Sequence, residues 1–184
     1  MAGRVLFICH GSTEATRRTR FALDEPLEDN ARTDAADLAG RLGLPADRQC
    51  LTGPARRCVQ TAEALGLNGE PDPGLADWDL GRWAGRRLDE VAAQEPDAVQ
   101  AWLTDASAAP HGGESLADLL HRVATWLDDV PRADRCVAVA GSAAVRAALV
   151  HTLRAPPESF WRIDVAPLAA VDLRGRAGDW RWHP

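Results

Sequence analysis

The 184-residue sequence contains no lysine and no tyrosine. The missing lysine excludes a Schiff-base enzyme and a P-loop that relies on lysine, and the missing tyrosine excludes a tyrosine nucleophile. All 21 basic residues are therefore arginines, and 27 acidic residues give a net charge of −6. Because a duplex-binding surface needs an excess of basic groups to displace counterions, we expect no nucleic-acid partner.

Long hydrophobic runs are also missing. The apolar run at the N-terminus, Val5–Cys9, is too short for the hydrophobic region of a signal peptide. No stretch approaches the roughly 20 apolar residues that a membrane-spanning helix needs, so we expect no membrane partner. The four cysteines lie far apart without a Cys-x-x-Cys pair, which fits reduced thiols and predicts a cytoplasmic location.

The rest of the composition is typical of a globular chain, with 46% hydrophobic and 26% charged residues. The length favours one domain, and the sequence contains no repeat and no long linker. We therefore predict a single domain over residues 1–184. Two short helices, predicted at about 88–94 and 96–103, would form a small helical flap at about 86–110.

Short apolar segments alternate with helical patterns along the chain. Strands are predicted at 4–9, 49–51, 136–140, 168–173 and 180–182, and helices at 34–42, 54–65, 116–130 and 142–153. Ser115 and Asp118 resemble a capping box at the start of the clearest helix. The alternation predicts a three-layer α/β/α sandwich with a mostly parallel central sheet. Since ligands of such folds bind at the carboxyl ends of strands, residues 9–13, 52–57 and 141–144 should line one rim.

Several motifs near this rim carry groups suited to phosphate chemistry. In chain order they are Cys9-His10-Gly11, Pro54-Ala55-Arg56-Arg57-Cys58-Val59-Gln60-Thr61-Ala62, Leu75-Ala76-Asp77, Gly81-Arg82-Trp83-Ala84-Gly85, Gly112-Gly113-Glu114-Ser115 and Val139-Ala140-Gly141. Taken singly, each residue has a structural interpretation: His10 as a strand-end histidine, Arg57 as a solvated helix arginine and Asp77 as a turn carboxylate. Their order along the chain favours a functional interpretation.

In this order the motifs resemble those of the histidine phosphatase superfamily, the phosphoglycerate mutase-like enzymes. That family shows Arg-His-Gly after its first strand, Ser-Pro-x-x-Arg-x-x-Gln-Thr-Ala, an acidic residue before Gly-x-Trp-x-Gly, Gly-Gly-Glu-Ser and a second histidine after the last core strand. The resemblance covers nearly the whole chain. It implies a phosphoglycerate mutase-like fold and hydrolysis of a small phosphorylated metabolite, an anionic substrate, with no metal and no other cofactor.

The resemblance also implies roles for individual residues. His10 would attack phosphorus and form a phosphohistidine, Arg57 would stabilise the charged phosphoryl oxygens, and Asp77 would protonate the leaving oxygen and then activate water. Cys9, Gly11, Gly141 and Ser142 would contact the substrate. Backbone N–H groups at Gly141-Ser142 suit an anion at a helix start, although Ser142 is equally suited to a plain N-cap.

Three departures from the family pattern predict a diverged active site. Cys9 stands in place of the first arginine, Gly141 in place of the second histidine, and Thr16 where many members have asparagine. Loss of one oxyanion donor typically costs a factor of roughly 10²–10³ in rate. We therefore expect slow turnover unless an arginine of segment 17–20 substitutes. Restoring the family residues, as Cys9→Arg with Gly141→His, should raise hydrolysis.

Other functions remain open at this point. The main alternative is a diverged member with non-phosphatase chemistry, or one that binds an anionic small molecule without catalysis. Cys50 and Arg56 have the spacing of a cysteine phosphatase, but Pro54 removes a cradling N–H between them. Cys9, His10 and His111 would be a metal site without diagnostic spacing. A purely structural interaction module and a homodimer also remain open.

Overall fold

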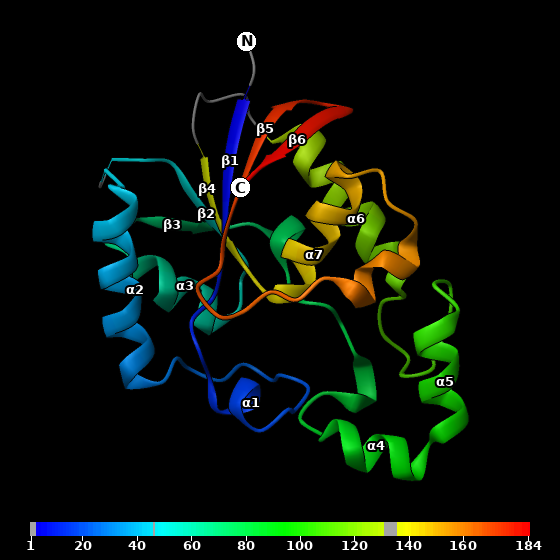
Figure 1. The fold of residues 1–184 in the computed structure, drawn as a ribbon. Helices are drawn as coiled ribbons and strands as arrows, with labels where there is room; N and C mark the ends of the chain where they lie inside the picture. Colours follow the sequence, from blue (N-terminus) through cyan, green and yellow to red (C-terminus); the bar gives the residue numbers. More distant parts are fainter. Residues whose placement is uncertain (1–2, 46, 131–135) are drawn as a thin grey trace.

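A computed structural model of the chain describes residues 3–45, 47–130 and 136–184. Six strands form one sheet in the order β3-β2-β4-β1-β5-β6 (Figure 1). The strands are β1 (Gly3–Cys9), β2 (Cys50–Thr52), β3 (Gly69–Pro71), β4 (Cys136–Ala140), β5 (Ala170–Arg176) and β6 (Asp179–His183). The first four run parallel, whereas β5 is antiparallel to β1 and β6 is antiparallel to β5. The predicted mostly parallel sheet is confirmed.

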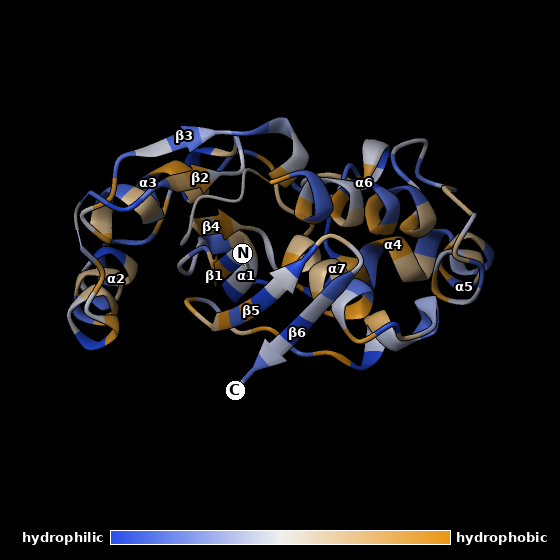
Figure 2. Cartoon of the chain, turned by 90° about the horizontal axis from the view of Figure 1, so that it is seen from above, coloured by the Kyte–Doolittle hydropathy of each residue, from blue (hydrophilic) through white to orange (hydrophobic). Residues whose placement is uncertain are grey.

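Helices cover both faces of this sheet. Figures 1 and 2 show α2 (Asp29–Leu42) and α3 (Arg56–Ala64) on one side and α6 (Leu116–Asp129) and α7 (Ser142–Thr152) on the other. Alternate residues of β1 point to opposite faces of the sheet. Phe7 packs in the core cluster beneath α6 and α7, and Ile8 packs in the cluster beneath α2 and α3. Burial on both faces explains why β1 and β4 are continuous apolar runs. The three-layer α/β/α prediction is therefore confirmed.

The helical flap consists of α4 (Leu88–Gln94) and α5 (Pro96–Thr104), the two helices expected at 88–94 and 96–103. They pack through a small aromatic cluster that includes Trp83 and Trp102. Trp78 and Trp161 pack against both this cluster and the core cluster beneath α6 and α7, and so join the flap to the core. No helix in the described part of the chain has both the length and the apolar character to cross a membrane.

Three local predictions were wrong. Helix α2 begins at Asp29 and not at Asp34, because its buried face begins with Ala31, a small residue within a polar stretch. Residues 12–33 form a polar segment for which no helix is predicted. This segment contains α1 (Glu14–Arg17), a short helix whose N-terminus is capped by the Thr13 side chain. The helical spacing of Leu116, Leu119, Leu120, Val123, Leu127 and Val130 predicts one buried stripe on α6, but Leu120 is only partly buried and Trp126 is buried as well.

Candidate functional site

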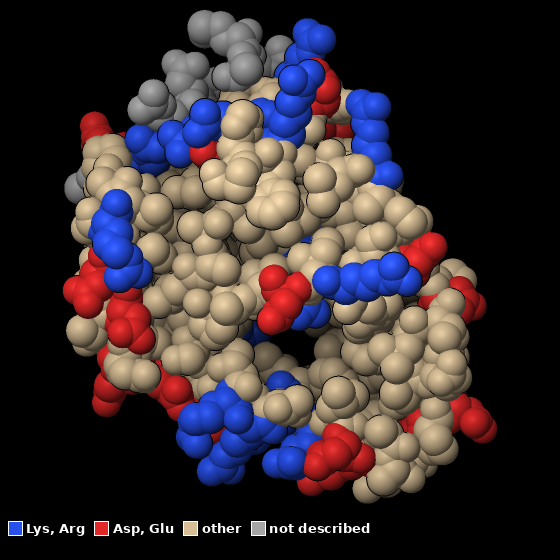
Figure 3. All heavy atoms as spheres, viewed as in Figure 1, with Lys and Arg blue, Asp and Glu red and all other residues tan. Residues whose placement is uncertain are grey.

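The carboxyl ends of β1 and β4 open into a cavity of about 250 Å³. His10 follows β1 directly, and its backbone N–H donates to the carbonyl of Ala140, the last residue of β4, at 3.0 Å. Five of the predicted site residues line this cavity: His10, Arg57, Asp77, Gly141 and Ser142. Figure 3 shows the hollow between α1 and the segment before β5, with arginine side chains around its opening.

The imidazole of His10 is held in one orientation. Its Nδ1 lies 2.7 Å from the carbonyl oxygen of Gly11, and because a carbonyl only accepts, Nδ1 carries the proton. In the neutral ring the other nitrogen, Nε2, is then unprotonated and carries the lone pair. Burial lowers the pKa of His10 below its ordinary value, and the charge of Arg57 lowers it further. The Gly11 hydrogen bond and the nearby carboxylates raise the pKa, but the net shift is downward. His10 is therefore a neutral, oriented base at neutral pH.

Arg57 is the buried cation of the cavity, with a side chain only 3% exposed. It lies in the first turn of α3, and its guanidinium donates to the Asp77 carboxylate and to the backbone carbonyl of Leu23. Glu25 lies 3.6 Å from the same guanidinium. The Nε of Arg57 is buried and has no hydrogen-bond partner in the described residues. Arg57 is thus charge-compensated at rest but keeps one donor for a ligand.

Asp77 fills space that Gly141 leaves free. A Cβ built on Gly141 would overlap the Oδ1 atom of Asp77. A histidine at position 141 would therefore displace the Asp77 carboxylate, and with it the partner of Arg57. In the variant that combines Cys9→Arg with Gly141→His, the new histidine would extend into the position that the Asp77 carboxylate occupies. The gain in hydrolysis predicted for that variant is therefore expected to be partial.

Cys9 and Gly11 do not appear among the described residues that line the cavity. The Cys9 side chain follows the strand alternation into the core cluster beneath α6 and α7, where burial raises its pKa to about 12. Gly11 donates its N–H to the Thr61 hydroxyl at 3.1 Å, and a Cβ there would lie 3.0 Å from the Ala31 Cβ. The structure therefore gives Cys9 a packing environment and gives Gly11 the task of orienting His10.

The remaining predictions from the sequence have mixed outcomes. Ser142 is the first residue of α7, and the N-cap position belongs to Gly141. Burial raises the pKa of Cys50 to about 12, which argues against the thiolate that a cysteine phosphatase requires. The described residues contain no group of three or more His, Cys, Asp or Glu side chains placed to hold a metal ion. His111 packs against Trp78 and Trp83 instead.

Two further arginines line the cavity. Of segment 17–20 only Arg20 reaches it, and its guanidinium lies 3.7 Å from the Glu14 carboxylate. Arg17 and Arg18 pair with Glu28 and Glu14 outside the cavity. Arg146 comes from α7, and sequence reasoning missed it. The spacing of Ser142 and Arg146 was an available signal, because residues four apart lie on the same helix face.

Arg146 carries little charge compensation. Its carboxylate neighbour, Asp164, is fully exposed and 3.9 Å away. The Arg146 guanidinium lies 5.7 Å from the centre of the Phe160 ring, and its Nε is buried with no hydrogen-bond partner in the described part of the chain. The charge of Arg146 also acts on the Cys9 thiol. Its positive charge therefore lies near the position where the family pattern has its first arginine.

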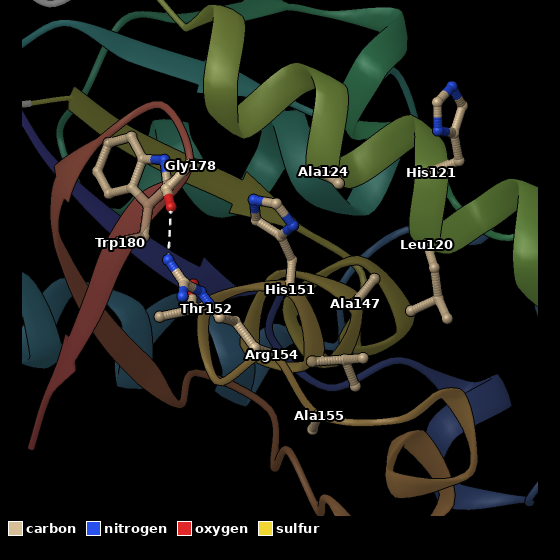
Figure 4. Close-up of a pocket in the computed structure, with 11 residues that line it drawn as sticks. Leu120, His121, Ala124, Ala147, His151, Thr152, Arg154, Ala155, Gly178 and Trp180 are labelled. Atoms are coloured by element: carbon tan, nitrogen blue, oxygen red, sulfur yellow. Dashed lines mark hydrogen bonds between the residues drawn. The ribbon is translucent and has the colours of Figure 1, made fainter.

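A second hollow, of about 410 Å³, lies elsewhere on the molecule, between α6, α7 and the β5–β6 turn (Figure 4). Its polar groups serve local packing: Arg154 donates to the Gly178 carbonyl at 2.9 Å, and Asp128 accepts from Trp180 at 3.0 Å and lies 3.4 Å from His151. Burial alone would raise the pKa of Asp128, but these hydrogen bonds and one from the Gly178 N–H lower it. None of the predicted site residues lines this larger hollow.

The fold and the cavity together define an α/β protein built like the histidine phosphatases. The chain belongs to the histidine phosphatase superfamily (branch 1), whose family model matches residues 5–183. It is 33% identical to a glucosyl-3-phosphoglycerate phosphatase of Mycolicibacterium vanbaalenii over 96% of this chain and 93% of that protein.

Solved structures agree with this assignment. A mycobacterial glucosyl-3-phosphoglycerate phosphatase matches with a TM-score of 0.81 and 28% identity over 99% of this chain and 97% of that one. A phosphoserine phosphatase variant from Entamoeba histolytica matches with a TM-score of 0.88 over 99% and 95% of the two chains. Its identity is 18%, so it supports the fold alone.

Proposed function

We propose that this protein hydrolyses a small phosphomonoester through a phosphohistidine at His10. The observation that carries the proposal is the His10 imidazole itself: neutral, fixed by Gly11, and with Nε2 free in a cavity that also contains Arg57 and Asp77. A fixed neutral imidazole is a nucleophile that needs no further activation. The family and the phosphatase names of its relatives support this chemistry.

The reaction would proceed in two steps, which begin once the substrate has displaced the Asp77 carboxylate from Arg57 and that carboxylate has taken a proton from solvent. In the first, Nε2 of His10 forms a bond to phosphorus as the ester P–O bond breaks, and the leaving oxygen takes a proton from the Asp77 carboxyl group. In the second, the Asp77 carboxylate takes a proton from water, the water oxygen bonds to phosphorus and the P–N bond breaks. Inorganic phosphate leaves, and His10 and Asp77 return to their starting states.

Substrate binding would rearrange the ion pair. A phosphate dianion would compete with Asp77 for the Arg57 guanidinium, because both need the same buried donors. Displaced from Arg57, the Asp77 carboxylate would be free to take the proton that it then donates to the leaving oxygen. The Arg57–Asp77 ion pair is thus the resting arrangement, and substrate binding would replace the carboxylate with phosphate as the partner of Arg57.

Arg146 and Arg20 would supply the positive charge that Cys9 does not. Preorganised cations around the phosphoryl oxygens provide much of the catalysis in phosphoryl transfer. Three arginines line the cavity, and Arg146 has an uncommitted buried Nε. The proposed site therefore differs from the family pattern in the source of its cations.

A binding function without turnover is the second candidate. The observation in its favour is that Arg57 is already engaged by Asp77, Glu25 and the Leu23 carbonyl, and that no histidine stands at position 141. In that case the cavity would bind a phosphorylated small molecule and release it unchanged. Phosphate affinity alone does not separate the two candidates, whereas turnover does.

The test is turnover of a chromogenic phosphomonoester by the full chain and two histidine variants. His10→Ala should abolish turnover, while His121→Ala, a matched change of an exposed histidine on α6, should leave it unchanged. Both variants should bind inorganic phosphate in calorimetry if folded. Turnover that survives His10→Ala would refute the phosphohistidine mechanism. Phosphate binding without any turnover in the unchanged chain would favour the binding function.

A further inference from the structure

The cavity has a second wall that the phosphate chemistry does not use. Charged groups surround His10. Beyond them the lining includes aromatic side chains from four segments: Phe21 after α1, Trp78 after Asp77, Trp102 of α5, and Phe160 and Trp161 in the 3-10 helix η3 (Pro157–Arg162). Threonine and small or aliphatic side chains complete the lining. Such convergence of rings at one end of a phosphate site suggests recognition of whatever the phosphate carries.

The rings form one continuous group. The Trp161 ring lies 4.7 Å from Trp102 and 5.9 Å from Trp78, and Trp78 lies 5.5 Å from Phe160. Trp78 is fixed further by a 2.7 Å hydrogen bond from its Nε1 to the Glu114 carbonyl. Edge-to-face and tilted contacts at these distances hold the rings without filling the cavity.

Packing alone does not account for this wall. Trp83, in the same flap cluster, is completely buried, whereas Phe21, Trp78 and Trp161 are only partly buried where they line the cavity. These three therefore leave part of their ring surface facing an open space. Aromatic surface held towards a cavity of a protein interior is favourable chiefly when a ligand covers it.

We propose that the phosphate group of the substrate is attached to a planar aromatic or heteroaromatic ring, which contacts Trp161, Trp78 and Phe21 while the phosphate lies against the arginines. This rests on the proposed function and specifies its substrate class. Arg146 joins the two ends, because its guanidinium lies over the Phe160 ring and its Nε faces no partner in the described residues.

Size and polarity narrow the class further. The cavity of about 250 Å³ exceeds the roughly 150 Å³ that suffices for a benzene molecule, so it suits a phosphate with a compact ring system. A sugar ring would need hydrogen-bonding partners for its hydroxyl groups. The partly buried side chains of this wall present aromatic ring faces, which do not supply such partners. An aromatic ring matches those faces by stacking.

The test compares three phosphomonoesters that share a primary alcohol as leaving group: benzyl phosphate, cyclohexylmethyl phosphate and glucose 6-phosphate. Because their leaving oxygens are alike, differences in kcat/KM report recognition of the ring. We expect benzyl phosphate to exceed the other two by at least about tenfold, which corresponds to about 1.4 kcal/mol. Equal values for benzyl and cyclohexylmethyl phosphate, or a preference for glucose 6-phosphate, would overturn the inference and leave the phosphatase proposal intact.

Variants locate the effect. Trp161→Leu should lower kcat/KM for benzyl phosphate about tenfold and change that for glucose 6-phosphate less than about twofold. Phe21→Leu should act in the same direction, which keeps the test decisive if Trp161→Leu does not fold. The matched control is Trp182→Leu, because Trp182 is 47% exposed on β6 and outside the cavity. Equal losses for all three esters in Trp161→Leu would mean a structural role and overturn the inference.

Absence of all hydrolysis would refute the proposed function rather than the aromatic preference. Calorimetric binding of benzyl and cyclohexylmethyl phosphate would then decide the inference. A preference for the benzyl ester that Trp161→Leu removes would sustain it, and equal binding would overturn it.

Discussion

Replacing Asp77 with asparagine removes the negative charge that engages Arg57 in the resting cavity. The Coulomb energy of such a pair is about 4 kcal/mol at 4 Å with an effective dielectric constant of about 20. The Asp77 side chain is 28% exposed, and solvent screening reduces the useful part to about 1–2 kcal/mol. Since phosphate would no longer compete with a carboxylate, Asp77→Asn should bind inorganic phosphate about tenfold more tightly.

The same variant should turn over slowly. General acid–base catalysis contributes a factor of about 10²–10⁴, and an asparagine supplies no transferable proton. Tighter phosphate binding with lost turnover is therefore the expected pair of results, measured by calorimetry and by steady-state hydrolysis of one phosphomonoester. A cost of about 1–2 kcal/mol in stability is expected, because Glu25 and the Leu23 carbonyl still serve Arg57.

Asp79→Asn is the matched control for this experiment. Asp79 is exposed and accepts a hydrogen bond from the Gly81 N–H at 2.9 Å, which an asparagine oxygen can also accept. It should change neither phosphate affinity nor turnover. Weaker phosphate binding in Asp77→Asn would refute the competition between Asp77 and the substrate for Arg57. Turnover equal to that of the control would refute the role of Asp77 as general acid and base.

Two further predictions concern stability. Gly141→Ala should destabilise the protein by about 1 kcal/mol, because the Asp77 carboxylate can move away from the new Cβ only by weakening its contact with Arg57. Gly40→Ala, with open space beside α2, should stabilise the protein by about 0.5–1 kcal/mol. Denaturant titration that finds Gly141→Ala as stable as the parent would contradict the packing. Hydrogen bonds from Arg86 and Arg82 lower the pKa of Glu95 from 4.5 to about 2, so the stability it contributes is complete above pH 4.5 and is lost as the pH falls towards 2. Glu95→Gln should flatten the decline of the melting temperature between pH 4.5 and 2, and an unchanged slope would contradict this.

The scaffold was largely predictable from the sequence because its central strands are buried on both faces. The run Cys136–Ala140 has no polar residue and became β4 with the predicted bounds. The order of motifs placed His10, Arg57 and Gly141 near one rim, and the structure brings them around one cavity. Both successes depend on backbone position, which hydrophobic pattern and chain order determine well.

Side-chain direction was harder to predict. Cys9 was expected at the substrate, yet it continues the alternation of Val5 and Phe7 into the core, a period-two pattern that the sequence already contains. Arg146 was overlooked because a helix arginine is usually solvated, and only the packing of η3 against α7 places it over Phe160. Such contacts join segments that are distant in sequence.

The Arg57–Asp77 pair could not be predicted from the sequence for a related reason. Aspartate is short, and it reaches Arg57 from the position that the removal of a side chain at Gly141 opens. Asp77 and Arg57 each match a family motif, and Gly141 alone of the three departs from one. Their joint effect depends on distances of a few ångströms that no motif specifies.

The most direct test of the central claim is to trap the covalent intermediate. The full chain is mixed with a phosphomonoester, quenched in alkali, which preserves phosphohistidine, and analysed by mass spectrometry of its peptides. The account predicts one phosphoryl group on His10 Nε2, and none in His10→Ala. Phosphorylation of any other residue, or turnover that proceeds with His10 unmodified throughout, would contradict the account.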